Sequence, residues 1–211
     1  MPPVNSGPSA WAAGMQNKRA LAMSVNRVII ELSLKQAMKR MQLEKLKIEK
    51  ATLDCTKVLE EFARQIRHNA PDEYFLQQYE IQEQGHREVL IGRSEGAVVG
   101  YVVLNWRPKY AFFRKSGIPE VQDLIVHPDY RRMGIAKALI AYCEDRARAM
   151  KFEYMGLGVG LDSSYGAAQV LYAGLGYAPD GNGVTYDRSP VMKGEMRPID
   201  DDLSLMLVKK L

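Results

Sequence analysis

The spacing of apolar residues along the chain alternates between the period of a strand and that of a helix. Short or alternating apolar runs predict strands. They lie at 46–51, 87–93, 97–106, 124–126, 154–161, 184–186 and 203–211. Apolar positions three and four residues apart predict helices. These lie at 55–68, 71–84, 135–150 and 163–175. Strands that alternate with helices in this way are typical of an α/β domain.

Glycine and aromatic residues mark special positions between and within these elements. Ser94-Glu95-Gly96 joins two strands and is a hairpin signal. Gly100 lies inside a strand, where glycine indicates a bulge or a close approach of another backbone. The glycines of 154–161 alternate, so one face is bare and leaves room for a slender ligand or a tightly packed helix. The aromatic-rich loop 107–119 lines a pocket or folds onto the core, and the sequence leaves both open.

The junction between the strand at 124–126 and the following helix has the chemistry of an anion site. Pro128 stops the strand because it cannot donate to a sheet ladder. Arg131-Arg132 then supplies positive charge, and the small residues Gly134 and Ala136 allow close approach to the start of the helix. A helix N-terminus carries unpaired N–H groups and a positive dipole end, so it binds phosphate readily. This order of elements predicts a pyrophosphate cradle.

Two motifs carry a resemblance to a known family. The order V-x-D-L-x-V-x-P-x-Y-R-x-x-G-I-A-x-x-L at 121–139 resembles the acyl-CoA signature of the GNAT superfamily of N-acyltransferases. The order A-x-x-L-Y-x-x-L-G-Y at 168–177 matches a second motif of that family. The resemblance spans residues 46–211. It implies a mixed, mostly antiparallel twisted sheet with helices on both faces and splayed central parallel strands, and it implies acetyl-CoA as co-substrate.

The resemblance also implies how the co-substrate is held. In that family, backbone amides at the helix start hold the pyrophosphate, and the pantetheine arm pairs with the preceding strand like an added strand. Where the family usually has an asparagine, three residues before Ala168, this chain has Tyr165, so that contact is lost or replaced by a nearby side chain. The residues expected to bind the cofactor are Leu124, Ile125, Val126, Arg131, Arg132, Met133, Gly134, Ile135, Ala136, Ser163 and Tyr165.

Three residues are candidates for catalysis. Tyr172 matches the family tyrosine whose hydroxyl protonates or hydrogen-bonds the leaving sulfur, although a tyrosine on an amphipathic helix is also an ordinary core residue. Glu120 and Asp123 are candidates for the base, acting directly or through a water. Glu120 falls near the position of the family's glutamate, and Asp123 lies on the other strand face if pairing is regular. The alternative role is a strand-end salt bridge, which we expect at Asp123 more than at Glu120.

The N-terminal part of the chain differs from the rest in composition. Residues 1–24 are rich in Pro, Ser, Gly and Ala and predict a disordered tail or a wrongly assigned start. Residues 25–45 carry apolar residues at helical intervals between lysines and predict a helical extension. Such a helix packs on its own domain or on a second subunit, or it binds a partner or membrane surface. Residues 46–211 are the predicted N-acetyltransferase domain.

Composition sets further limits. A chain of 211 residues suits one domain with a proper core, and its net charge of +4 is too weak to indicate nucleic acid. No run approaches the length of a membrane span, and no metal site is expected. Cys55 and Cys143 lie on apolar helix faces, which predicts buried free thiols and a reducing, cytoplasmic location.

The sequence therefore predicts an enzyme that moves an acetyl group from acetyl-CoA to a primary amine, by direct attack in a ternary complex. The expected partner is a small-molecule amine, with neither nucleic acid nor membrane involved, and a homodimer is left open. Two alternatives remain. One is acetylation of protein lysines or N-termini, and the other is a non-catalytic acyl-CoA sensor that uses its N-terminal helix to bind a partner.

Overall fold

The computed structural model describes residues 23–25, 27–34, 37, 41, 43–66 and 70–211. They fall into two units, divided between Glu44 and Lys45, which are described separately. In the first unit the described residues are helical, which confirms the predicted N-terminal helical extension. Residues 1–22 of the predicted tail lie outside the described residues, so the domain boundaries stay a prediction. No helix in the described part of the chain is both long enough and apolar enough to cross a membrane.

The second unit alternates strands and helices in the predicted order. Its strands are β1 (Leu46–Lys50), β2 (Arg87–Ser94), β3 (Ala97–Asn105), β4 (Glu120–Val126), β5 (Tyr154–Gly160), β6 (Ala178–Tyr186), β7 (Ser189–Pro190) and β8 (Leu203–Lys210). Its helices are α2 (Cys55–Gln65), α3 (Tyr74–Glu83), α4 (Ala111–Ser116), α5 (Ile135–Ala149) and α6 (Gly166–Gly174), with short 3-10 turns η1 (Pro128–Tyr130) and η2 (Ser163–Tyr165). The α/β class is therefore confirmed.

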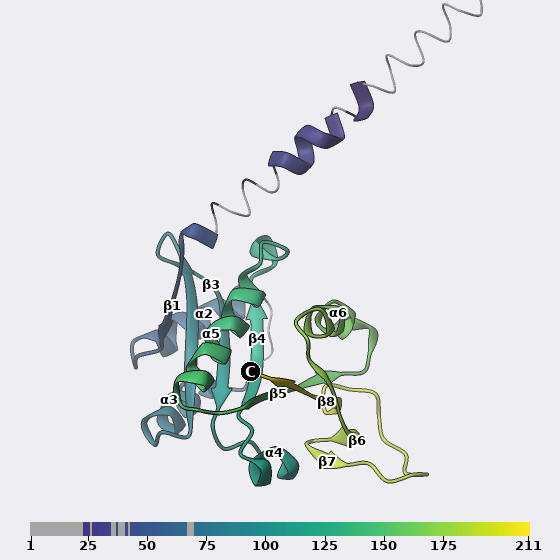
Figure 1. The fold of residues 1–211 in the computed structure, drawn as a ribbon. Coiled ribbons are helices and arrows are strands. Elements are labelled where there is room, and N and C mark those ends of the chain that lie inside the picture. The colour runs from purple at the N-terminus through teal and green to yellow at the C-terminus, as the bar shows by residue number, and fades with distance from the viewer. Residues whose placement is uncertain (1–22, 26, 35–36, 38–40, 42, 67–69) are drawn as a thin grey trace, which may run out of the picture. The chain divides into compact units, whose positions relative to one another are not determined.

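All eight strands form one sheet, in the order β1-β2-β3-β4-β5-β8-β6-β7. Every neighbouring pair is antiparallel except β4 and β5, which are parallel. Figure 1 shows that β5 turns away from β4 toward β8, so the sheet divides into a β1–β4 half and a β5–β8 half. This is the mostly antiparallel sheet with splayed central parallel strands that the resemblance implies.

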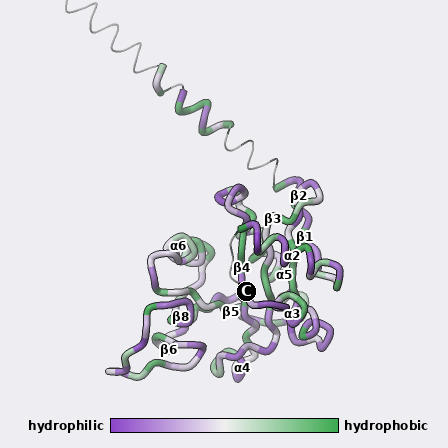
Figure 2. The backbone as a smooth tube through the Cα atoms, turned by 180° about the vertical axis from the view of Figure 1, so that it is seen from behind, coloured by the Kyte–Doolittle hydropathy of each residue, from purple (hydrophilic) through white to green (hydrophobic). Residues whose placement is uncertain are grey.

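The strands bury opposite faces against different helices, because alternate side chains of a strand point to opposite sides. Val102 packs with Leu139 of α5 in the larger core, whereas the next residue, Val103, packs with Phe62 of α2 in a second core. We call these sides of the sheet the α5 face and the α2–α3 face. In Figure 2, the view from behind, hydrophobic residues follow the central strands and hydrophilic residues gather on the outer loops.

The aromatic loop 107–119 folds onto the sheet rather than staying open. It contains the helix α4, and Tyr110 and Phe113 are only 2% and 0% exposed. Phe113 fills the bare face of β5, because a Cβ built on Gly156 would lie 2.3 Å from its ring. The sequence left two interpretations open for each of these features. The structure shows that the loop folds onto the core and that a helix packs closely on the bare face of β5.

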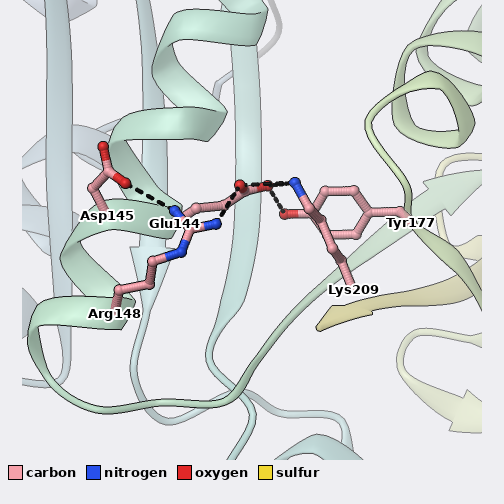
Figure 3. A network of polar contacts seen from close by, with 5 residues as sticks. All are labelled: Glu144, Asp145, Arg148, Tyr177 and Lys209. Carbon is pink, nitrogen blue, oxygen red and sulfur yellow. Dashed lines mark hydrogen bonds and ion pairs between the residues drawn. The ribbon is translucent and has the colours of Figure 1, made fainter. Parts of the chain in front are cut away.

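A buried carboxylate links the two halves of the sheet. Glu144 of α5 has a side chain only 6% exposed, and its oxygens accept hydrogen bonds from Lys209 Nζ of β8 at 2.7 and 2.8 Å. Tyr177 directly precedes β6, and its hydroxyl donates to the same carboxylate at 3.1 Å. Figure 3 shows these side chains meeting from opposite sides, with Arg148 reaching the carboxylate from within α5. The network ties α5 to β8 across the division of the sheet.

Replacing Glu144 by alanine should lower the free energy of unfolding by about 2–3 kcal/mol, because Lys209 and Tyr177 lose a shared acceptor in a mostly buried place. Asp145→Ala is the matched control, since this neighbour is 75% exposed and pairs with Arg148 at the surface. The control should change stability by less than about 0.5 kcal/mol. Chemical denaturation measures both variants, and equal small losses would contradict the linking role.

Candidate active site

The site begins where the sheet divides. β4 and β5 are paired only at Glu120 with Gly156 and at Val121 with Leu157. Beyond these pairs β4 continues along β3 while β5 continues along β8. The backbone edge of β4 from Gln122 onward therefore has no strand paired with it on the β5 side, and we call this separation of the two backbones the gap (Figure 1). An unpaired strand edge of this kind can take up an extended ligand by added-strand pairing.

A bulge in β4 helps the strand diverge from β5. The residues Gln122 and Ile125 lie opposite Val103 and Tyr101 of β3, so β4 has one residue more than its partner between these pairs. The extra residue falls at Asp123, whose φ of 49° is left-handed. Bulges bend the strand that carries them and increase its twist. The Asp123 side chain is expected on the strand face opposite to that of Glu120 only if the pairing of β4 is regular. The bulge makes this pairing irregular, so the condition for that expectation is not met.

Gly100 permits this arrangement by close approach. A Cβ built on Gly100 would lie only 2.7 Å from the carbonyl oxygen of Ile125, so only glycine fits without a shift of the backbone. The ladder between β2 and β3 also changes register beside it, between Gly92 and Arg93. Both features expected of a glycine inside this strand, a bulge and a close approach, are present.

The predicted ligand-pairing segment presents its backbone to the gap. His127 N donates to Val99 O of β3 at 2.9 Å, so the polar groups of His127 point toward β3. Successive residues of a strand direct their backbone N–H and C=O groups to opposite edges. The backbone groups of Val126 and Leu124 therefore point into the gap, and those of Ile125 point toward β3. The Arg131 side chain donates from Nε to Val126 O at 3.2 Å, which places this guanidinium at the end of the gap.

The start of α5 offers free backbone donors. The first hydrogen bond of the helix runs from Ala138 N to Gly134 O at 3.0 Å. Before the helix, Arg131 N donates to Pro128 O at 3.2 Å. The N–H groups from Arg132 to Ala136 bond to no described residue. Arg132 and Gly134 have left-handed φ values of 64° and 90°. This loop shape, the helix dipole and two arginines fit a pyrophosphate.

The other predicted cofactor residues are anchored around this loop and around η2. Ile135 is 1% exposed, so its side chain fixes the helix start in the core while its amide stays free. The Tyr165 ring covers Gly160, where a built Cβ would lie 2.4 Å from it. Its hydroxyl donates to Asp201 at 2.9 Å, and burial together with this carboxylate raises the pKa of Tyr165 to about 12. Ser163 is exposed. Their contact with the cofactor stays a prediction.

Tyr172 lies on α6 and is 8% exposed. It packs in the same core as Leu157 of β5 and Val126 of β4, the two strands that border the gap. Its ring contacts Tyr177 at a centroid distance of 6.2 Å, and its hydroxyl bonds to no described residue. Burial raises the pKa of Tyr172 to about 12, so the hydroxyl keeps its proton at neutral pH. This is the state that a proton donor needs.

The two candidate bases have different surroundings. Glu120 is 0% exposed, and its Oε1 accepts from Arg188 Nε at 2.9 Å, while its Oε2 has no described partner. Burial raises the pKa of Glu120, and Arg188 opposes this shift. The strand-end salt bridge is therefore found at Glu120, whereas we had expected it at Asp123. The sequence does not reveal Arg188 because it lies 68 residues away, in the β6–β7 turn.

Asp123 is exposed and accepts a hydrogen bond from the Tyr74 hydroxyl of α3. No lysine or arginine among the described residues forms an ion pair with it. Burial and the Asp123 carboxylate raise the pKa of Tyr74, so the tyrosine remains a donor. Asp123 thus offers a negative charge that is open to solvent, at the bulge beside the gap.

A strand edge open to an extended ligand, next to a helix start that fits a pyrophosphate, defines the class of enzymes that bind a phosphorylated acyl carrier. The model of the Acetyltransferase (GNAT) family matches residues 55–177. The match covers more than half of the chain, and the chain belongs to this family. It is an acyltransferase that uses acetyl-CoA. No curated protein matches the chain.

Solved structures with this fold include the ribosomal-protein-alanine N-acetyltransferase of Brucella melitensis, at 22% identity and a TM-score of 0.57 over 78% of this chain and 99% of that chain. The Salmonella typhimurium protein yncA, solved with its cofactor acetyl-CoA, is 21% identical with a TM-score of 0.55 over 79% and 94% of the two chains. A GNAT family acetyltransferase of Elizabethkingia anophelis with acetyl-CoA bound is 15% identical, with a TM-score of 0.50 over 79% and 99%. At these identities the likeness shows the fold.

A Gly134→Glu variant should bind acetyl-CoA about 100-fold more weakly, because its carboxylate repels the pyrophosphate at the helix start. Gly194→Glu is the matched control, since Gly194 has φ 89°, close to the 90° of Gly134, and lies in the β7–β8 connection. It carries the same backbone strain and the same added charge. Calorimetric titration with acetyl-CoA measures both affinities, and an equal loss in the two variants would refute the cradle.

Proposed function

We propose that the enzyme acetylates the primary amine of a small molecule by direct attack within a ternary complex. The observation that carries this proposal is Asp123, an exposed carboxylate without a described cationic partner, at the bulge of the strand that borders the gap. A protonated amine is the natural partner of such a group, and holding both reactants together supplies much of the rate.

The reaction balances with groups of this chain and solvent water. Asp123 binds the ammonium form and accepts one proton from it, directly or through a water, so that the neutral amine attacks the thioester carbonyl. The C–N bond forms, the second amine proton passes to solvent water as the tetrahedral intermediate collapses, and the C–S bond breaks. Tyr172 donates its hydroxyl proton to the leaving thiolate. Solvent water then returns a proton to Tyr172 and takes up the proton held by Asp123.

Glu120 is the second candidate base, and its environment limits it to a relayed role. Its Oε1 is held by Arg188, and only its buried Oε2 lacks a described partner. A carboxylate with a raised pKa is a stronger base than an exposed one, but Glu120 is fully buried at the point where β4 and β5 pair. A water is therefore needed between it and an amine in the gap.

Alternative acceptors receive no specific support. The Brucella melitensis relative is described as acting on a ribosomal protein alanine, but at 22% identity it shows the fold alone. A non-catalytic sensor does not account for a protonated Tyr172 on α6 together with an exposed Asp123 on β4, the strand that borders the gap. A cytoplasmic location, inferred from two buried free cysteines, and a homodimer both stay predictions.

A panel of acceptors tests the proposal. Free CoA should be released from acetyl-CoA when a small primary amine is added. It should not be released with secondary amines of the same size or with lysine-containing peptides. Asp123→Asn should lower kcat/KM for the best amine by about 100-fold, through the loss of a charge-assisted contact. Turnover with peptides only would favour a protein acceptor, and binding of acetyl-CoA without any turnover would favour the sensor.

Tyr172→Phe should lower kcat by about 10- to 100-fold and leave the affinity for acetyl-CoA unchanged, because it removes only the proton for the leaving thiolate. The fold should not suffer, since the hydroxyl bonds to no described residue. With the pKa of Tyr172 near 12, the wild type should show no loss from this group below about pH 10. Steady-state kinetics across pH, with titration calorimetry alongside, checks both statements; unchanged kcat would remove Tyr172 from catalysis.

A further inference from the structure

Three buried side-chain atoms in the described part of the chain have no hydrogen-bond partner: Arg87 Nε, Tyr101 Oη and Glu120 Oε2. An unsatisfied buried polar atom costs about 1–3 kcal/mol, so such atoms are rare and call for a reason. Tyr101 and Glu120 are both 0% exposed. Two of the three atoms are donors or can donate, and one is an acceptor.

The sheet register places these atoms on one face. Arg87 of β2 lies opposite Asn105 of β3, and Asn105 lies opposite Glu120 of β4, so the three form one row across the sheet. Residues directly opposite one another point to the same side. Tyr101 precedes Asn105 by four residues on β3 and shares its side, which is the α2–α3 face. The unsatisfied atoms thus all project from the face that carries Asp123 and Tyr74.

The charges on this face leave one cation and one anion without an ion-pair partner. Glu120 is paired with Arg188. Arg87 donates to the neutral Gln78 of α3, and no carboxylate in the described ranges forms an ion pair with it. Asp123 likewise has no cationic partner among them. The two groups lie beside the same helix, because Asp123 accepts a hydrogen bond from Tyr74 and Arg87 donates to Gln78, one turn further along α3.

A partly buried cation and an exposed anion that are not paired with each other complement a molecule carrying the opposite two charges. A simple amine would satisfy Asp123 and leave Arg87 unpaired, at a cost. A molecule with an ammonium group and a carboxylate satisfies both, and the Tyr101 hydroxyl and Arg87 Nε–H supply further donors for the carboxylate.

We propose that the acceptor is an amino acid: its amine is held by Asp123 for acetylation, and its carboxylate is held by Arg87 and Tyr101. This rests on the proposed function and narrows it to amines that carry a carboxylate on the same small skeleton. Arg87 and Tyr101 are then specificity-determining residues that contact the end of the substrate away from the reacting nitrogen.

The test compares amino acids with their own carboxamides, which keep the amine and the size and lose the negative charge. Glycine, β-alanine and 5-aminopentanoate cover three distances between the two groups, and kcat/KM is expressed per ammonium form, because that is the form that Asp123 binds. For at least one of the three amino acids, kcat/KM should exceed that of its carboxamide by about 30-fold or more. This is the effect expected from losing a charge-assisted bidentate contact. Equal or greater activity with every amide would overturn the proposal.

Variants locate the discrimination. Arg87→Gln should bring the acid-to-amide ratio close to one by lowering activity on the acid alone. Arg93→Gln is the matched control on the same strand. Arg93 forms an ion pair with Glu49 at 2.7 Å and lies outside the proposed site, so this variant should preserve the acid-to-amide ratio. A ratio unchanged in Arg87→Gln would contradict the assignment.

A second variant keeps the proposal open to refutation if Arg87→Gln fails to fold. Tyr101→Phe removes a hydroxyl without a described partner and keeps the ring contacts with Phe75 and Phe62, so folding should be intact. It should reduce the acid-to-amide ratio about 3- to 10-fold; no reduction would count against the site. Efficient turnover of amines lacking a carboxylate would refute the amino acid while sustaining the proposed function, and no turnover of any amine would refute the proposed function itself.

Discussion

The geometry of the active site depends on how little of β4 is paired with β5. Two register pairs, at Glu120 and Val121, hold the strands together before they separate. A backbone edge left without a strand must find partners in water or in a ligand, because unpaired N–H and C=O groups are costly once buried. The bulge at Asp123 and the close approach at Gly100 set where the separation starts. The gap is therefore built into the ladder of hydrogen bonds, and the helix start at Gly134 lies at the end of the strand that borders it.

A divided sheet needs contacts that hold its halves at a fixed separation, and two buried carboxylates supply them. Glu120 of β4 takes Arg188 from the β6–β7 turn, and Glu144 of α5 takes Lys209 from β8. In both pairs the cation belongs to the β5–β8 half of the sheet, and the anion belongs to the β1–β4 half in one case and to the helix α5 in the other. Charges that are mostly removed from water tolerate little change in distance, so these pairs favour one geometry of the gap over many.

The parts that sequence predicts well are those set by local periodicity. Alternating or continuous apolar runs identify the strands of the sheet, and the small and basic residues of 131–136 mark the helix start. Long-range pairing decides the rest. The partner of Glu120 comes from far along the chain, and the bulge at Asp123 requires knowledge of which β3 residues lie opposite. The six-residue helix α4 has no full amphipathic period to detect, and the side-chain direction of Arg87 matters only once β2, β3 and β4 are in register.

We propose that backbone groups recognise the acetyl donor and that side chains recognise the acceptor. In the proposed binding mode the donor is recognised through amides of 132–136 and the edge of β4, and backbone groups are the same whatever side chain a position carries. The acceptor is proposed to be recognised by side chains on the α2–α3 face, such as Asp123 and Arg87, which a single substitution changes. A fold organised in this way keeps its donor while its acceptor varies, which explains why family membership establishes the acetyl-CoA chemistry and leaves the amine to be inferred from unpaired charges on one face of the sheet.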